Sequence, residues 1–292
     1  MKPAEQAQIV SMGRAIAMGR YPVCARFAHY LDFKDGDDII GLTDMRDEGG
    51  AHTLVLAGLR AGWTARAAEL IVGSDAVVFD GQIFARDELQ LFRDKIHAAA
   101  LPHTEQMRRL GIFRDTILEH AAPLSMAVVL DSTRRENFQG NFARALCDRF
   151  LEGAAACAMG EYARAAALLQ GVGYGLTPSG DDFLCGVMLA LHHSGDAHDA
   201  QELADALTDT LSRSAFMART FLRDAIAGRW PRRLRDAAES LHGAGQDNII
   251  RSAVIRALDH GASSGADLAS GFIYTALHQC AQSAASRDLV CA

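Results

Sequence analysis

The sequence predicts an α+β protein in which a mainly antiparallel β lobe precedes a larger all-helical lobe. Two observations carry this prediction. Before about residue 95, short β-rich runs alternate with turn residues. After it, the chain is rich in Ala and Leu at helical spacing. We therefore expect the 292 residues to form a β lobe over 1–95 and a helical lobe over 96–292.

The β lobe is expected to contain short strands separated by turns, over residues 23–33, 38–43, 52–57, 69–72, 76–79 and 82–85. Asp80-Gly81 between the last two runs is a strong hairpin signal, because both residues tolerate positive φ. The segment Lys34-Asp35-Gly36-Asp37 is a second turn. A short helix over residues 1–18 is predicted to come first.

The helical lobe is expected to hold one isolated strand, Ser125 to Leu130. Helices are predicted over 87–100, 105–120, 141–157, 161–170, 180–193, 200–227, 231–241, 246–259 and 265–285.

Composition excludes several classes of function. The chain is 49% hydrophobic and 22% charged, which is an ordinary globular composition. A net charge of −7 argues against nucleic acid as a partner. No run approaches the ~20 apolar residues that cross a bilayer, and the N-terminus lacks a secretory pattern. The six cysteines form no CxxC pair, so we expect reduced thiols in a cytoplasmic protein.

The segment best suited to binding or catalysis is GVGYGLTPSGDDFLCG, residues 171–186. Five glycines in sixteen residues indicate a structural requirement for glycine, such as positive φ, close helix contact or a ligand against the backbone. A Gly-rich loop that enters a helix presents N–H groups and the positive end of the helix dipole, which suits an anion. The segment matches neither the P-loop nor the dinucleotide fingerprint.

Asp181 and Asp182 stand in the first turn of the predicted helix, beside the hydroxyls of Thr177 and Ser179. The two carboxylates could hold a divalent cation such as Mg²⁺. Alternatively, Ser179-x-x-Asp182 is a capping box that needs no ligand. The spacing alone favours capping over metal binding.

The pattern Ser-Gly-x-Asp-apolar-x-x-Gly occurs twice, at 179–186 and at 264–271. Two similar helix N-termini could face one cleft, each supplying N–H groups and a carboxylate. Alternatively, the two helices share one capping solution, or they pack against each other through Gly186 and Gly271. The shared cleft is slightly favoured. It adds Ser264, Gly265 and Asp267 to the candidate residues.

Other candidates are weaker. Arg213 or Arg219, near Ser214, could reach a carboxylate ligand, although an exposed ion pair is the expected use. The pair His192-His193 is expected to act at a helix C-terminus rather than in a metal site.

The segment GLTPSGDDFLCG resembles the characteristic motif of a bacterial family, once of unknown function, whose best-known member is a subunit of oxamate carbamoyltransferase in allantoin degradation. The likeness extends to the preceding helix (165–173), to Ser214, Leu222, Ala225 and Gly228, to Ser264-Gly265-Ala266-Asp267 and, more weakly, to 23–27. Tyr174 stands where many relatives carry a proline.

The resemblance implies a cytoplasmic protein that acts with two larger, unlike subunits. The implied reaction is the reversible phosphorolysis of oxalurate to oxamate and carbamoyl phosphate. We expect the N–H groups from Gly173 through Gly175 to Gly180 to hold a small anion that the Thr177 and Ser179 hydroxyls orient. Asp181 or Asp182 would then position a metal ion or a substrate N–H.

Two alternatives stay open. The chain could be a non-catalytic interaction subunit whose motif only folds the helical lobe. It could also be a stand-alone Mg²⁺-dependent enzyme that acts on another ureido or phosphorylated small molecule.

Overall fold

The computed structural model describes residues 8–36, 38–46, 48–59, 62–86, 91–93, 95–96, 101–243 and 246–290, with side chains to residue 283. The chain folds into two compact units, residues 1–95 with 229–233, and residues 96–228 with 234–292. The α+β class is confirmed, since a mostly antiparallel sheet precedes a helical region. No helix in the described part of the chain is long and apolar enough to cross a bilayer.

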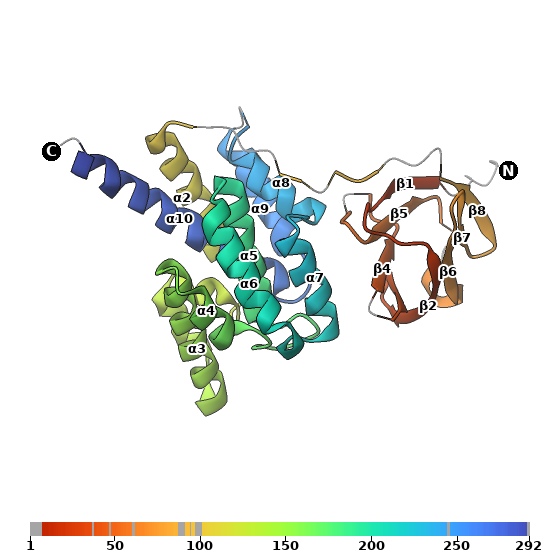
Figure 1. Ribbon diagram of the computed structural model, residues 1–292, viewed down its shortest axis with the longest axis horizontal. Coiled ribbons are helices and arrows are strands. Elements are labelled where there is room, and N and C mark those ends of the chain that lie inside the picture. Colours follow the sequence, from red (N-terminus) through yellow and green to blue (C-terminus); the bar gives the residue numbers. More distant parts are fainter. Residues whose placement is uncertain are drawn as a thin grey trace. The chain divides into compact units, whose positions relative to one another are not determined.

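The first unit is built on one sheet (Figure 1). Its strands are β1 Gln8–Met12, β2 Gly19–Arg26, β3 Tyr30–Asp35, β4 Asp38–Thr43, β5 Thr53–Ala57, β6 Glu69–Val72, β7 Ala76–Phe79 and β8 Gln82–Ala85, with a short helix α1 Trp63–Arg66. The strand order is β1-β5-β4-β3-β2-β6-β7-β8, and all neighbours are antiparallel except β4 and β5.

Turn chemistry and aromatic packing explain this sheet. Asp80 and Gly81 have φ values of 48° and 72°, and their positive φ closes the β7–β8 hairpin as predicted. The side chains of Phe33 and Trp63 pack edge-on against Phe79, with ring centroids 6.1 and 5.9 Å away. These rings belong to the core of the unit.

Three expectations for this unit were wrong. Residues 8–12 of the predicted 1–18 helix form β1, because they pair with β5 from much later in the chain. Residues 1–7 lie outside the described residues. The predicted 23–33 run is divided between β2 and β3. Of the predicted 87–100 helix, Leu91 forms a bridge with Met12 instead, and residues 87–90, 94 and 97–100 lie outside the described residues.

The second unit is helical. Its α-helices are α2 His103–His120, α3 Gly140–Ala158, α4 Tyr162–Leu169, α5 Ser179–Ser194, α6 Ala197–Asp209, α7 Phe216–Ile226, α8 Arg232–Ser240, α9 Asp247–Leu258 and α10 Ser264–Val290. Short 3₁₀ helices are η1 Met126–Val129, η2 Ser132–Asn137 and η3 Leu211–Arg213. The first two residues of α8 belong to the first unit, where the Arg232 amide donates to Gly49 O (2.8 Å).

Two helical-lobe expectations need correction. The segment Ser125 to Leu130, predicted as a strand, contains the buried 3₁₀ helix η1, and the Ser125 hydroxyl accepts from the Ala127 amide. A short buried apolar run does not distinguish a strand from a helix. The predicted 200–227 helix is broken into α6, η3 and α7. The Thr210 hydroxyl, at the end of α6, turns back to Ala206 O.

Helix α5 is the centre of this unit (Figure 1). Every residue from Ser179 to Leu191 is buried, so the helix is covered on all sides. It contacts α4, α6, α7, α10 and η1. Its start therefore places polar residues of the motif inside the protein.

Candidate functional site

The candidate site is formed by the starts of α5 and α10 and by the loop before α5. The loop is drawn tightly onto the preceding helix. The Gly180 amide donates to Val172 O (2.8 Å), and a Cβ at Gly180 would lie 2.0 Å from Leu169 O. Only glycine fits at this contact, so this part of the motif is explained by packing.

The predicted capping box is not formed. The N-cap of α5 is Pro178, without a side-chain cap, and Ser179 is already helical. The amides of Asp181 and Asp182 both donate to Pro178 O (2.9 and 3.1 Å). The side chains of Ser179 and Asp182 are consequently available for contacts with other elements.

The loop itself offers N–H donors. Gly173 has a φ of 135°, and a Cβ there would lie 2.4 Å from Ser179 N, so both conformation and space require glycine. Tyr174, Gly175 and Leu176 are exposed. Across the described residues, no acceptor contacts the amides of residues 173–177. They differ in this from the amides of Gly180, Asp181 and Asp182, each of which donates to a backbone oxygen.

Asp181 holds the beginning of the loop against another part of the unit. Its Oδ1 accepts from the Gly171 amide and from the Ser214 hydroxyl, each at 2.9 Å. Ser214 directly follows η3, so this contact joins α5 to the η3–α7 connection. Asp181 and Asp182 are adjacent in sequence but contact different partners.

Asp182 and Asp267 exchange partners between the two motif copies. Burial raises the pKa of Asp182 of the α5 copy, and the neighbouring hydroxyls of Ser264, from the α10 copy, and of Thr177 partly offset this rise. Burial likewise raises the pKa of Asp267 of the α10 copy, and the Ser179 hydroxyl from the α5 copy partly offsets it. Thr177 Oγ1 and Ser264 Oγ are also 2.8 Å apart. The structure therefore brings the predicted residues of both copies into one polar cluster.

Two contacts of Asp267 were missed by the sequence interpretation. Its Oδ1 accepts from the Met126 amide (2.5 Å), and the nearby Ser263 hydroxyl partly offsets the rise in its pKa that burial causes. The Ser263-Ser264 doublet is a weak sequence signal for the second contact. A backbone amide leaves no signal at all.

The electrostatics of the cluster follow from its burial. Asp181, Asp182 and Asp267 are 1%, 4% and 0% exposed. Burial is the largest cause that raises the pKa of each one, to about 7 for Asp267 and well above the usual value for Asp182. The negative charge of Asp267 raises the pKa of Asp182 further.

Glycines at the middle of the two copies bring the helices together. A Cβ at Gly186 would lie 2.0 Å from Leu268 O, and one at Gly271 would lie 2.1 Å from Phe183 O. The two helix backbones thus touch reciprocally, as the packing alternative predicted. This contact fixes the distance between the two acidic helix starts.

Several other sequence candidates lie elsewhere. Arg213 is exposed, and the Arg219 guanidinium lies 5.7 Å from the ring centroid of Phe216. His193 Nε2 lies 2.5 Å from His242 Nε2. Burial lowers the pKa of His193 to about 4, so this imidazole is neutral and does not place a cation at the C-terminus of α5.

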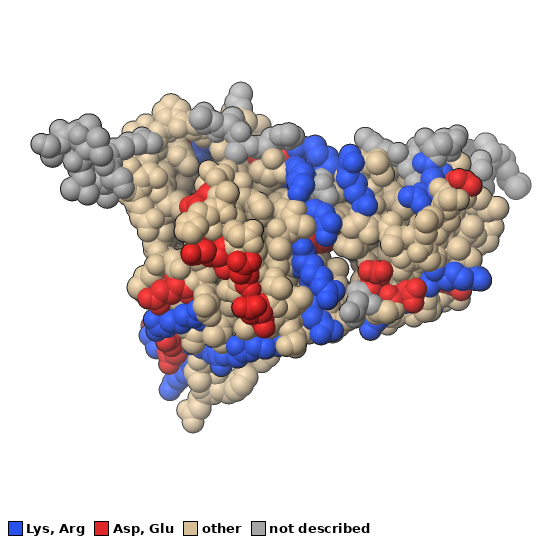
Figure 2. Space-filling view, viewed as in Figure 1, with Lys and Arg blue, Asp and Glu red and all other residues tan. Residues whose placement is uncertain are grey.

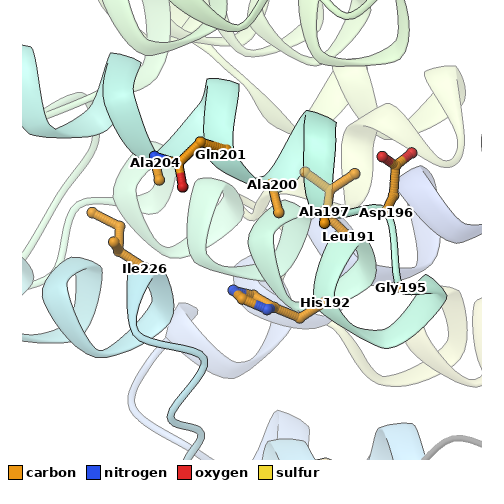
Figure 3. Close-up of a pocket in the computed structure, with 9 residues that line it drawn as sticks. All are labelled: Leu191, His192, Gly195, Asp196, Ala197, Ala200, Gln201, Ala204 and Ile226. Atoms are coloured by element: carbon orange, nitrogen blue, oxygen red, sulfur yellow. The ribbon is translucent and has the colours of Figure 1, made fainter.

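A small pocket lies at the opposite end of α5 from the carboxylates (Figure 3). Its volume is about 330 Å³, and α5, α6 and α7 contribute its walls. His192 and Gln201 are among its polar lining residues, beside Leu191, Ala200 and Ile226. None of the predicted site residues lines it.

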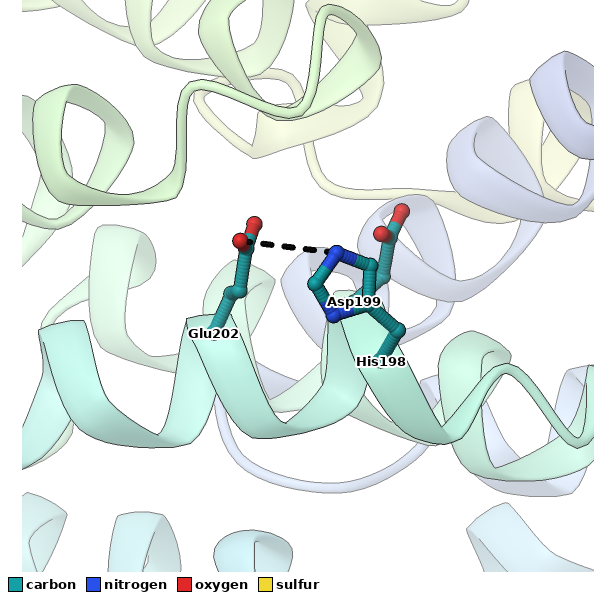
Figure 4. A group of neighbouring side chains, drawn as sticks. All are labelled: His198, Asp199 and Glu202. Atoms are coloured by element: carbon teal, nitrogen blue, oxygen red, sulfur yellow. Dashed lines mark ion pairs between the residues drawn. The ribbon is translucent and has the colours of Figure 1, made fainter.

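Acidic side chains gather over α6 on the face that Figure 2 shows. His198, Asp199 and Glu202 form a group there whose potential ligand atoms lie within 4.8 Å of one another (Figure 4). His198 Nε2 is 3.6 Å from Glu202 Oε1, and their side chains are 81% and 53% exposed. Asp199 Oδ2 accepts from the Tyr162 hydroxyl (2.7 Å). Such contacts are typical of an ordinary solvated helix face, and they explain why these side chains lie together.

The fold and the cluster define a class of α+β protein in which two repeated helix starts each contribute a buried carboxylate to one polar cluster. Residues 169–276, which span both motif copies, match the family described as oxamate carbamoyltransferase subunit AllH. The family resemblance is confirmed over that segment, somewhat more than a third of the chain. No curated protein and no solved structure matches the chain.

Proposed function

We propose that this chain is a subunit of an oxamate carbamoyltransferase of allantoin degradation and bears part of its active site. The observation that carries the proposal is the extent of the family match, which begins at the last residue of α4 and includes both acidic helix starts. The proposed reaction is oxalurate plus phosphate to oxamate plus carbamoyl phosphate. Two larger, unlike subunits would complete the enzyme, with 1–95 and 96–292 as the two domains of this chain.

The loop over residues 173–177 is the proposed anion site. Its amides have no protein acceptor among the described residues, and its central residues are exposed. Gly173 and Gly175, with φ values of 135° and 85°, let consecutive amides turn toward a small ligand. Phosphate, oxalurate and oxamate are all anions that such amides bind. The hydroxyls of Thr177 and Ser179 would orient the bound anion.

During phosphorolysis the site must stabilise the negative charge that develops on the carbonyl oxygen. A phosphate oxygen attacks the ureido carbon and the carbonyl oxygen gains negative charge. The bond from that carbon to the oxamate nitrogen then breaks, and the nitrogen takes up the proton that the hydrogen phosphate gives up. Donors already fixed in place stabilise this charge without reorganisation. The loop amides meet that demand, while Asp181 fixes the loop through Gly171 and Asp182 positions a metal ion or a substrate N–H.

The alternative of a non-catalytic interaction subunit has its own supporting observation. Tyr174 and Leu176, at the tip of the loop, are 51% and 61% exposed, and Tyr174 packs against the 72% exposed Phe142. Large apolar side chains at a loop tip suit contact with another subunit. In this alternative the tightly packed glycines serve only the fold.

Reconstitution separates the two possibilities. The three subunits are assayed together for carbamoyl phosphate formation from oxalurate and phosphate, and each subunit is then omitted in turn. We expect the complete complex alone to be active, and Asp182→Asn to assemble normally but lose turnover. An Asp182→Asn complex that keeps full activity but has a lower Tm would leave the motif as a folding device. Turnover by this chain alone would contradict the requirement for partners.

A further inference from the structure

The strongest unexplained feature of the polar cluster is a set of buried carboxylate oxygens. The Oδ2 atoms of Asp182 and Asp267 are inaccessible to solvent and have no hydrogen-bond partner among the described residues, although their side chains lie in a cluster rich in hydroxyls. Asp181 Oδ2 is also buried and has no hydrogen-bond partner among the described residues. An ionised carboxylate in the interior is strongly disfavoured unless something positive contacts it.

No basic side chain of the described residues supplies that charge. The largest influences on Asp182 and Asp267 are burial, hydroxyl groups, a backbone amide and other carboxylates. The hydroxyls of Thr177 and Ser264 contact Asp182, while the Met126 amide and the Ser179 hydroxyl contact Asp267. All of these donor groups are neutral. The pair can be balanced only by protons or by a bound cation.

The chemistry of the donors indicates which cation would fit. The carboxylates at the starts of α5 and α10 are close enough for the charge of Asp267 to raise the pKa of Asp182, and the Thr177 and Ser264 hydroxyls lie 2.8 Å apart. All of these ligands are hard oxygens, and no sulfur or imidazole is among them. Mg²⁺ prefers such oxygens and is commonly held by one or two carboxylates plus phosphate oxygens and water. A site with only two protein carboxylates next to an anion-binding loop has this composition.

We propose that Asp182 and Asp267 together bind one divalent cation of the Mg²⁺ class, shared between α5 and α10. The oxygens of Thr177 and Ser264 add to its ligands, and the anion on loop 173–177 completes them. The inference rests on the proposed function only in its choice of phosphate as that anion. It differs from a site at Asp181 and Asp182, because Asp181 Oδ1 already binds Gly171 and Ser214.

The pairing also explains the repeat in the sequence. Each copy of Ser-Gly-x-Asp contributes one carboxylate, and the Gly186–Gly271 contact sets the separation of the two. A cation bound at this position would join the two copies. The largely exposed group His198, Asp199 and Glu202 provides the matched control, because it contains ligand atoms but no buried oxygen that lacks a partner.

Mn²⁺ is a suitable probe because it replaces Mg²⁺ and is paramagnetic. The purified full chain is titrated with Mn²⁺ at pH 8 by electron paramagnetic resonance, with and without inorganic phosphate, and Mg²⁺ is added as competitor. We expect one Mn²⁺ per chain, displacement by Mg²⁺ and tighter binding with phosphate. Asp182→Asn and Asp267→Asn should each weaken binding at least tenfold, whereas Glu202→Gln should leave it unchanged.

A second measurement needs no variant and so does not depend on their folding. Bound Mn²⁺ broadens the amide resonances of nearby residues, so those of 177 and 264–267 should disappear before those of 198–202. Protons compete with the cation for the carboxylates, so affinity should fall as the pH is lowered from 8 to 6.

Three outcomes would overturn the inference. These are no stoichiometric Mn²⁺ on the wild-type chain, binding that Glu202→Gln abolishes, and broadening centred on residues 198–202. In each of them the buried pair is balanced by protons alone. Because the probe experiments involve no turnover, they can fail while reconstituted activity persists, and the reverse also holds. The inference and the proposed function are thus tested separately.

Discussion

The starts of α5 and α10 use one packing solution in two different surroundings. In both copies the glycine after the serine touches the end of the preceding helix, since a Cβ at Gly180 or Gly265 would lie 2.0 or 2.2 Å from a carbonyl oxygen there. In both copies the aspartate is buried, and a serine hydroxyl of the other copy partly offsets the rise in its pKa that burial causes. The shared features are those that dock two helices closely.

The two copies differ most clearly in the chain that precedes each helix. Before α10 a short turn suffices, and the Gly265 and Asp267 amides donate to His260 O and Ser263 O (both 2.9 Å). Before α5 stands the longer Gly-rich loop, whose amides have no acceptor in the described part of the chain, and Asp181 occupies the position of the buried Ala266. The shared Ser-Gly-x-Asp pattern therefore docks the two helices. The proposed anion site depends on the loop that only the α5 copy has.

The largest effect should come from the glycines that the two copies share. Gly186→Ala and Gly271→Ala each place a Cβ about 2 Å from a backbone oxygen of the other helix. A backbone oxygen within a helix cannot move aside, whereas the end of a flexible side chain could. We expect each substitution to lower the free energy of unfolding by about 3 kcal/mol or more, the upper range for overpacking. Urea denaturation would measure the loss.

The matched control is Gly111→Ala in α2, where an added Cβ meets nothing within 4 Å. This variant should gain about 0.5–1 kcal/mol, because alanine favours a helix interior over glycine. If Gly186→Ala were as stable as Gly111→Ala, the reciprocal helix contact would be incorrect.

The next effect concerns charge, and it should depend on pH. Burial raises the pKa of Asp267 to about 7, so the folded protein holds this proton more tightly than the unfolded chain does. The stability from this group is complete below the unfolded pKa and is lost as the pH rises through about 7. Asp267→Asn cannot ionise, yet its amide oxygen can still accept from Met126. We therefore expect the variant to gain stability over wild type between pH 5 and pH 8, by a few kcal/mol on the order of the shift in pKa.

Thermal unfolding in cation-free buffer at several pH values would measure this difference. Added Mg²⁺ should return stability to the wild type at pH 8 but not to Asp267→Asn, because only the ionised pair binds the cation. A stability difference that stays constant between pH 5 and pH 8 would show that Asp267 does not titrate in this range.

A third variant makes the two copies alike. Asp181→Ala converts Ser-Gly-Asp-Asp into the Ser-Gly-Ala-Asp of the α10 copy. The fold should persist, but the Gly171 amide and the Ser214 hydroxyl lose their acceptor, at a cost of about 1–3 kcal/mol. Ser214→Ala removes one of the two donors and should cost about 1 kcal/mol. Equal stability of wild type and Asp181→Ala would mean that Asp181 does not anchor the loop.

Local signals in the sequence predicted most of the fold. The helical spacing of 141–157 and 180–193 and the Asp80-Gly81 turn each determine structure within one element, and the structure contains α3, α5 and the β7–β8 hairpin. The errors arose where distant contacts decide the structure. Residues 8–12 are a strand because β5 pairs with them, and Ser125 to Leu130 is a 3₁₀ segment packed in the interior.

The candidate site was likewise predicted in part, with errors where contacts between distant residues decide the structure. The repeat in the sequence identified Ser179, Asp182, Ser264 and Asp267, and the packing alternative correctly paired Gly186 with Gly271. Spacing within one copy suggested a capping box, because Ser179 and Asp182 stand at the right separation for it. Their actual partners belong to the other copy, and a pattern within a single helix carries no information about which distant helix packs beside it.

The smallest effect tests the direct contact between Thr177 of the loop and Ser264 of the α10 copy. Thr177 Oγ1 and Ser264 Oγ are 2.8 Å apart, and Thr177→Val keeps the shape of the side chain while removing the hydroxyl. We expect a loss of about 1 kcal/mol in stability, the usual net value of one hydrogen bond. Mn²⁺ and phosphate binding should weaken by more than this loss suggests, because Thr177 belongs both to the anion loop and to the proposed ligand set. Thr210→Val at the end of α6 is the control, since its hydroxyl also makes part-buried hydrogen bonds but lies outside the cluster. If both variants lowered Tm equally and neither changed Mn²⁺ binding, the loop and the carboxylate pair would be independent features.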